Sequence, residues 1–189
     1  MSESYGQVCR RLEQIRQDKA DLTQVNIHHG QQLNPLLTEA LVQLTLGAPQ
    51  IIYNGGLLMC SVRYYAAQSC RPGLPPDVAA LVEKIGPRNV TIQMINLNLF
   101  ESRQVLLQAG GIGEHQFEAV CYNQHLSSYL GAIDSYAAPA LETERRTVPI
   151  NDKYLEVRML PATEIRLELS VNRSVNTPSY ASPWVDGKK

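Results

Sequence analysis

Short runs of alternating apolar and polar residues dominate the second half of the chain. In residues 163–171, Ile165, Leu167 and Leu169 alternate with charged and polar neighbours, which is the pattern of a strand with one buried face. Turn residues such as asparagine and glycine separate six such runs, at residues 89–97, 103–108, 117–122, 147–150, 154–159 and 163–171. Short strands joined by such turns predict an antiparallel β-sandwich.

The first half of the chain has helical periodicity instead. Apolar residues recur every three or four positions in residues 5–20 and 35–46, and a third, shorter helix is expected at residues 78–85. The sequence therefore predicts an α+β fold, with N-terminal helices packed on the antiparallel β-sandwich. In this interpretation residues 1–87 form a helical and hairpin region, and residues 88–189 form the sandwich domain.

The segments between these elements are also readable. Residues 21–30 are polar and are expected to form a connector. An Asn-Gly turn at residues 54–55 lies between two apolar runs, so it predicts a β-hairpin formed by residues 51–53 and 57–65. Residues 124–146 interrupt the strand pattern, and we expect them to form a long loop or a short helix.

Composition excludes several classes of function. The 189 residues carry a formal net charge of −1, so no broad basic surface is available for nucleic acid and no polybasic segment for an anionic membrane. The N-terminus lacks the apolar core of a secretory signal, and no apolar run approaches the ~18 residues that a membrane span needs. We therefore expect a cytoplasmic protein that binds neither nucleic acid nor membranes.

The four cysteines do not predict a metal site. Cys9, Cys60, Cys70 and Cys121 form no C-x-x-C pair and have no histidine at zinc-finger spacing. We expect free thiols that are mostly buried. No cofactor and no metal is predicted.

Two short polar segments are candidates for catalysis. His28 and His29 are adjacent, with Glu39 among the nearest carboxylates, and Glu114-His115 follows three glycines within residues 110–113. Histidine and glutamate exchange protons near neutral pH when their pKa values are suitably shifted, so these five residues define a possible hydrolase or lyase site. The alternative is structural: a polar connector at the histidine pair, and a wide turn at the glycines, because no phosphate-binding Lys-Ser or Lys-Thr follows them.

Aromatic residues are candidates for binding. The chain has nine tyrosines but only one tryptophan, and a tyrosine or tryptophan offers a flat apolar face with a polar tip to a sugar or a protein partner. The selected residues are Tyr64, Tyr65, Tyr180 and Trp184, although tyrosines are equally common as packing residues at sandwich corners. The proline-containing tail, residues 175–184, is expected to lie extended across the body with Tyr180 and Trp184 as anchors.

Three stretches in the second half carry a family resemblance. They are the segment Ile95-Asn96-Leu97, the turn Leu160-Pro161-Ala162 and the strand at residues 163–171. Residues 88–184 resemble the C-terminal β-sandwich accessory domain that follows the catalytic barrel in glycoside-hydrolase-like bacterial proteins. The resemblance implies that this chain corresponds to the accessory domain of such proteins and has neither their catalytic barrel nor a catalytic carboxylate pair.

The sequence leaves three hypotheses about the function of this protein. The first is a non-catalytic accessory or assembly module, which binds a separate catalytic chain, another protein or a carbohydrate. The second is the small hydrolase or lyase with a His/Glu site. The third is a homo-oligomeric structural protein in which the N-terminal helix pairs with its own copy.

Overall fold

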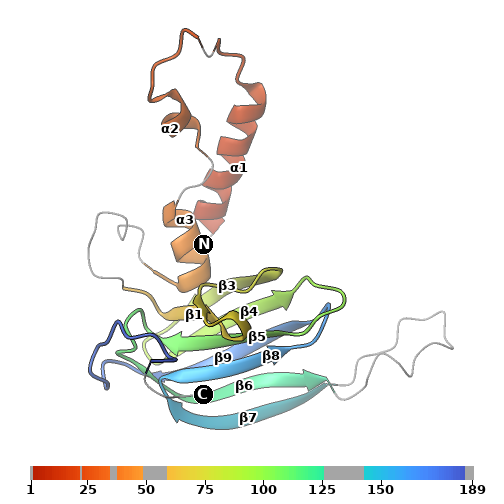
Figure 1. Cartoon of the computed structure of the whole chain (residues 1–189), viewed down its shortest axis with the longest axis vertical. Helices are drawn as coiled ribbons and strands as arrows, with labels where there is room; N and C mark the ends of the chain where they lie inside the picture. Colours follow the sequence, from red (N-terminus) through yellow and green to blue (C-terminus); the bar gives the residue numbers. More distant parts are fainter. Residues whose placement is uncertain (1, 22, 35–37, 49–58, 126–142, 186–189) are drawn as a thin grey trace, which may run out of the picture.

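The computed structural model describes residues 2–21, 23–34, 38–48, 59–125 and 143–185, which form a mixed α+β fold consisting mostly of β-strands (Figure 1). Its helices are α1 (Ser2–Gln17), α2 (His29–Leu33) and α3 (Thr38–Leu46). The helices predicted near residues 5–20 and 35–46 are therefore confirmed in their described parts. The predicted connector differs at its end, because α2 begins there.

In the described residues, nine strands form two antiparallel sheets. The four-stranded sheet has the order β2-β1-β5-β8, and the five-stranded sheet has the order β3-β4-β9-β6-β7. Their bounds are β1 (Val62–Ala66), β2 (Arg71–Pro72), β3 (Val78–Ile85), β4 (Asn89–Asn96), β5 (Arg103–Ala109), β6 (Gln116–His125), β7 (Thr143–Asp152), β8 (Tyr154–Met159) and β9 (Glu164–Asn172).

All six strands predicted in the second half are confirmed. The observed β6 and β7 are longer than expected, because both extend toward the predicted interruption at residues 124–146, whose last residues belong to β7. The Asn-Gly turn and the first arm of the predicted hairpin lie outside the described residues, whereas the second arm contributes β1.

The predicted helix at residues 78–85 is wrong, because the same residues form strand β3. Val78 and Val82 are buried, and a spacing of four residues suits a helix face and an alternating strand equally well. These residues form a strand and not a helix because they pair antiparallel with β4. A tight turn joins the two strands, and in it the Gly86 N–H donates to the Asn89 carbonyl at 2.8 Å. Tertiary pairing thus overrides local helical preference.

One hydrophobic cluster contains side chains from both sheets. The largest fully buried members include Tyr64 and Leu107 from the four-stranded sheet, with Ile92, Phe117 and Leu169 from the five-stranded sheet. Strands β1, β2 and β3 precede residue 88 in the chain, so the first 87 residues contribute to both sheets.

The helices extend away from the sheets. Helix α3 contacts β3, and its last carbonyl, at Leu46, accepts a hydrogen bond from the Ser61 N–H just before β1. Helix α1 runs beside α3, while α2 lies at the far end of the helical arm (Figure 1). No helix in the described ranges is both long enough and apolar enough to cross a membrane.

All four cysteines are free thiols, as predicted. Their expected burial is wrong for most of them. Cys60 is buried and Cys121 is half-buried, but Cys9 lies exposed on α1 and Cys70 is exposed next to β2.

Candidate functional site

The predicted histidine pair lies on the helical arm. The His29 Nε2 atom is 2.7 Å from a carboxylate oxygen of Asp18, and the His28 Nδ1 atom is 3.0 Å from the side-chain oxygen of Gln31. The His29–Asp18 contact joins the start of α2 to the residue after α1, whereas the His28–Gln31 contact lies within the α2 turn. Glu39 lies on α3, and its side chain is outside the described part of the structure.

The Glu114-His115 pair occupies the turn between β5 and β6. The Glu114 carboxylate accepts a hydrogen bond from the Ile112 N–H at 2.9 Å, and Gly110 and Gly113 have positive φ angles of 84° and 70°. The glycines therefore form a wide turn around a carboxylate of the chain itself, which leaves no room there for a phosphate.

His115 holds the C-terminal tail. Its Nδ1 atom accepts a hydrogen bond from the Ser174 N–H at 3.0 Å, which places the ring proton on Nε2, and its carbonyl accepts one from the Asn176 amide at 2.6 Å. Burial lowers the pKa of His115, so the ring is held neutral. These contacts give His115 a structural role in fixing the tail.

A hollow of about 380 Å³ lies beside this pair. Cys60 is the candidate nucleophile among its lining residues, and Arg173 is its cation. Burial, with a smaller contribution from Glu114, raises the pKa of Cys60 to about 12, so the thiol stays protonated at neutral pH. Arg173 donates to the carbonyls of Gly86 and Pro87 at 2.9 and 2.8 Å, which ties it to the β3–β4 turn. A protonated thiol with a raised pKa is a poor nucleophile, so Cys60 is not activated in this hollow.

The four selected aromatic residues have different environments. Tyr64 and Tyr65 are buried at 2% and 3% exposure, so their rings form part of the interior and not an exposed platform. The Tyr65 hydroxyl donates to the Gln108 side-chain oxygen at 3.1 Å. Trp184 packs against Tyr65, as expected of an anchor, whereas Tyr180 is 68% exposed and does not anchor the tail.

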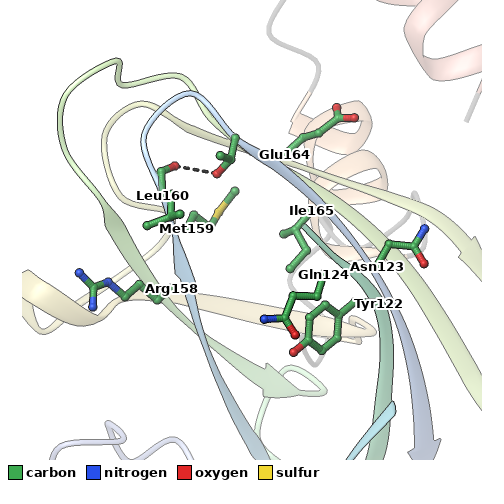
Figure 2. Close-up of a pocket in the computed structure, with 9 residues that line it drawn as sticks. Tyr122, Asn123, Gln124, Arg158, Met159, Leu160, Glu164 and Ile165 are labelled. Atoms are coloured by element: carbon green, nitrogen blue, oxygen red, sulfur yellow. Dashed lines mark hydrogen bonds between the residues drawn. The ribbon is translucent and has the colours of Figure 1, made fainter. Parts of the chain in front are cut away.

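A partly apolar open surface lies along β8, an outer strand of the four-stranded sheet in the described part of the chain. Two adjoining hollows of about 260 and 270 Å³ share Tyr122 of β6, Arg158 of β8 and Ile165 of β9 (Figure 2). We call their combined lining the strand-edge groove, formed by Val120, Tyr122, Asn123, Gln124, Val148, Leu155, Glu156, Val157, Arg158, Met159, Leu160, Thr163, Glu164, Ile165 and Leu167.

Aliphatic side chains from both sheets line the part of the groove beside β8, and polar side chains such as Asn123 and Gln124 line the rest. Leu155, Val157 and Met159 alternate along β8 toward the interior, and Val148 of β7 is opposite Val120 of β6 on the same face of the five-stranded sheet. Val148 remains 43% exposed, and in the described part of the chain β8 is the last strand of the four-stranded sheet. The groove can therefore accept an apolar segment.

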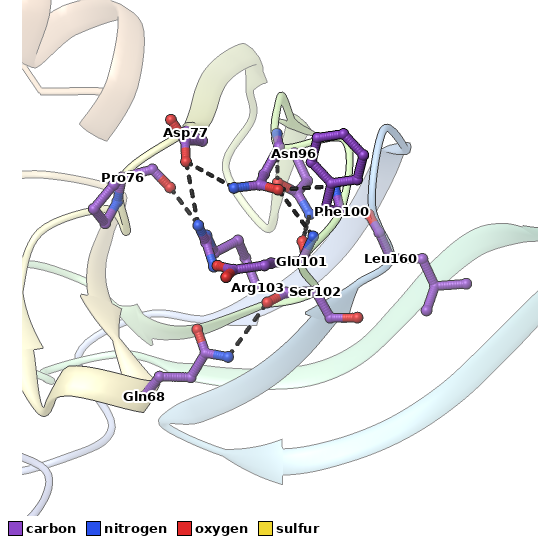
Figure 3. Close-up of polar contacts among 10 residues, drawn as sticks. Gln68, Pro76, Asp77, Asn96, Phe100, Glu101, Ser102, Arg103 and Leu160 are labelled. Carbon is purple, nitrogen blue, oxygen red and sulfur yellow. Dashed lines mark hydrogen bonds and ion pairs between the residues drawn. The ribbon is translucent and has the colours of Figure 1, made fainter.

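A polar network borders one end of the groove. The buried Asn96 side chain donates to the carbonyls of Glu101 and Leu160 at 2.9 and 3.0 Å, and the Arg103 guanidinium is 3.2 Å from a carboxylate oxygen of Asp77 (Figure 3). The Asn98 side-chain oxygen accepts the N–H groups of Phe100 and Glu101, both at 2.9 Å. The network fixes a β4–β5 turn whose apolar side chains point outward, with Phe100 88% exposed.

Sequence reasoning missed the strand-edge groove. The alternation in β8 and β9 was visible, but it predicts only a buried face and not that β8 is the outer strand of its sheet among the described residues. No group of three or more histidine, cysteine or acidic residues within the described residues could hold a metal ion. The comparisons with protein families, with curated proteins and with solved structures found no match.

Proposed function

We propose that this protein is a non-catalytic assembly module that binds a partner protein in the strand-edge groove. The observation that carries the proposal is the hollow beside β8, the last strand of the four-stranded sheet among the described residues, where the aliphatic side chains of Val148, Leu155 and Ile165 remain partly exposed. Partly exposed apolar side chains beside an unpaired strand edge can receive the apolar residues of an added protein segment. As part of this proposal, the two sheets pack face to face as a β-sandwich, and the chain is related to the accessory domains of glycoside-hydrolase-like proteins.

The lining of the groove favours a protein partner over a carbohydrate. Sugar sites present flat aromatic faces to solvent. Tyr64 and Tyr65 lie in the interior, and Tyr122 is the aromatic residue of the groove, among aliphatic and polar residues. Valine, leucine and isoleucine side chains suit the apolar residues of a protein segment instead.

The separation of the candidate catalytic residues supports binding over catalysis. His28 and His29 contact residues of the helical arm, whereas Glu114 and His115 contact the C-terminal tail. A hydrolase or lyase needs its acid, base and nucleophile around one reacting atom. Free thiols agree with the proposed cytoplasmic location, where glutathione and thioredoxin keep cysteines reduced.

Site-specific photo-crosslinking tests this function in the full chain. A crosslinking amino acid at Val148 would capture a partner in cells, and the same amino acid at Lys84 is the matched control. Lys84 is exposed on β3, at the opposite edge of the five-stranded sheet. The captured protein is then purified, and its binary affinity is measured for the wild type, Val148→Glu and Lys84→Glu.

We expect one protein to crosslink from Val148 and not from Lys84, and to bind Val148→Glu at least about tenfold more weakly. Equal capture at both positions, or equal affinities for both variants, would overturn the proposal. A glycan array that identifies a sugar whose binding is lost in Val148→Glu would also overturn it, in favour of a carbohydrate module.

A further inference from the structure

The two sheets have four outer strands, and three of these carry features that hinder pairing with another strand. β2 has only two residues and includes Pro72, β3 has a register shift between Val82 and Lys84, and β7 contains Pro149 beside another register shift. Short length, proline and bulges are the usual ways in which sheet edges are protected. β8 has neither proline nor bulge, and its six residues pair with β5 in unbroken register.

The hydrogen-bond pattern shows which backbone groups of β8 face outward. The Ala109 N–H donates to the Lys153 carbonyl at 2.8 Å, in line with the β5–β8 register. Hydrogen-bonded and non-hydrogen-bonded pairs alternate in an antiparallel ladder, so Leu155 and Val157 direct their N–H and C=O groups toward β5. Glu156 and Arg158 direct theirs toward the open edge, where no strand pairs with β8 in the described part of the chain.

The side chains of β8 specify the chemistry of an incoming strand. Glu156 and Arg158 are exposed on the outer face, and Val157 and Met159 are buried on the inner face. A complementary strand must place a cation opposite Glu156 and an anion opposite Arg158, with apolar residues at the alternate, inward-facing positions to cover Val148 and Ile165. Charged and apolar residues therefore alternate along such a strand.

A second folded copy does not meet this requirement. Two copies joined along β8 by a twofold axis would keep their five-stranded sheets on the same side of the joined sheet. Strands β6 and β7 continue beyond β8 (Figure 1), so the β6–β7 hairpins of the two copies would occupy the same space. A single extended segment avoids this overlap.

From these features we propose that β8 receives an extended strand of the partner protein, paired antiparallel with it and lying over the β6–β7 hairpin. The added strand completes the four-stranded sheet above β7. This inference rests on the proposed function and specifies how the partner binds.

A synthetic peptide with the sequence of residues 153–160 is a suitable probe. β8 is self-complementary: when the peptide pairs antiparallel with position 157 opposite Val157, its glutamate faces Arg158 and its arginine faces Glu156. The peptide lacks the β6–β7 hairpin, so it can enter where a folded copy cannot. The labelled peptide is titrated with the full chain, and binding is followed by fluorescence anisotropy.

Two matched peptide pairs separate charge from backbone pairing. Exchanging the glutamate and arginine of the peptide should weaken binding roughly tenfold, and the Glu156→Arg/Arg158→Glu protein should reverse that preference. N-methylation at the peptide's glutamate and arginine removes the N–H groups that face β8 and should abolish binding. N-methylation at the peptide's Leu155 and Val157 positions alters only the opposite edge and should leave binding intact.

The outcomes distinguish this inference from the proposed function. If the peptide does not bind, or if both N-methylated peptides bind equally, strand addition is overturned, yet a partner crosslinked from Val148 still supports the assembly function. A dimer of the full chain that is lost in Glu156→Arg would overturn the inference in favour of self-association. Binding that follows both the charge and the N-methylation patterns supports strand addition.

Discussion

The indole of Trp184 meets the ring of Tyr65 edge-on, with the ring centroids 5.6 Å apart and an interplanar angle of 85°. The contact joins the C-terminal tail to β1, across most of the length of the chain. Edge-to-face aromatic pairs contribute stability beyond the area that they bury. The tail is thus part of the folded body.

Replacing Trp184 by alanine should lower the free energy of unfolding by about 2 kcal/mol, because it removes the ring contact and the partly buried apolar area. Urea denaturation followed by circular dichroism measures the loss. Tyr180→Ala, in the same tail, is the control and should change stability by less than about 0.5 kcal/mol because Tyr180 is exposed. Equal losses in the two variants would show that the tail is not anchored at Trp184.

Removing the hydroxyl groups of Tyr64 and Tyr65 should have opposite effects. The Tyr64 hydroxyl is buried without a hydrogen-bond partner among the described residues, whereas the Tyr65 hydroxyl donates to Gln108. We expect Tyr64→Phe to raise the free energy of unfolding by up to about 1 kcal/mol and Tyr65→Phe to lower it by about 1 kcal/mol. Thermal denaturation of both variants provides the measurement, and a loss at Tyr64 as large as that at Tyr65 would reveal a hidden partner.

Asn96 should be among the polar residues that matter most for stability. It is fully buried, donates to two carbonyls and accepts the Asn98 N–H at 3.1 Å. Asn96→Ala leaves these groups unpaired and should cost about 3 kcal/mol, measured by denaturant unfolding. Asn123→Ala, an exposed change on β6, should leave stability nearly unaltered. A cost below about 1 kcal/mol at Asn96 would mean that water replaces the lost contacts.

Stability should fall as the pH drops below neutrality because of His115. Burial lowers the pKa of its ring, Arg173 lowers it further, and Glu114 opposes both effects. Between this lowered pKa and the unfolded value near 6.5, the unfolded chain binds more protons. Stability from this group is therefore complete above pH 6.5 and is lost as the pH falls through that window.

Denaturation midpoints between pH 7.5 and 5 test this dependence. His115→Asn is the variant of choice, because its side-chain oxygen can still accept the Ser174 N–H that Nδ1 accepts in the wild type. Its stability should vary less with pH across this range. Parallel curves for the two proteins would exclude His115 as the source.

Much of the strand pattern could be read from the sequence, and the reason is local. Along β8 and β9 the alternation of apolar and polar residues matches one buried face, so the expected ranges agree with the observed strands to within a residue. For β3 the pattern of apolar and polar residues is ambiguous, because the spacing of Val78 and Val82 fits both a helix and a strand. Only the pairing of these residues with β4 decides that they form a strand.

The candidate site could be predicted less well than the strands from the sequence. His28, His29, Glu114 and His115 attracted attention by residue type, but the histidine pair contacts Gln31 and Asp18 of the helical arm, and His115 holds the tail. The groove beside β8 arises from strand order, because the four-stranded sheet ends at β8 while the five-stranded sheet continues to β7. Strand order depends on long-range pairing, which a single sequence does not reveal.

The central position of β9 has a consequence for synthesis on the ribosome. β9 pairs with β4 on one side and β6 on the other, although more than 65 residues separate β4 from β9 in the chain. Until β9 leaves the exit tunnel, the hairpins β3–β4 and β6–β7 have no strand to join them. The inner edge of β4 therefore stays unpaired while the more than 65 residues between β4 and β9 are made, whereas the β6–β7 hairpin waits only for β8 and its flanking turns before β9 can join the two hairpins.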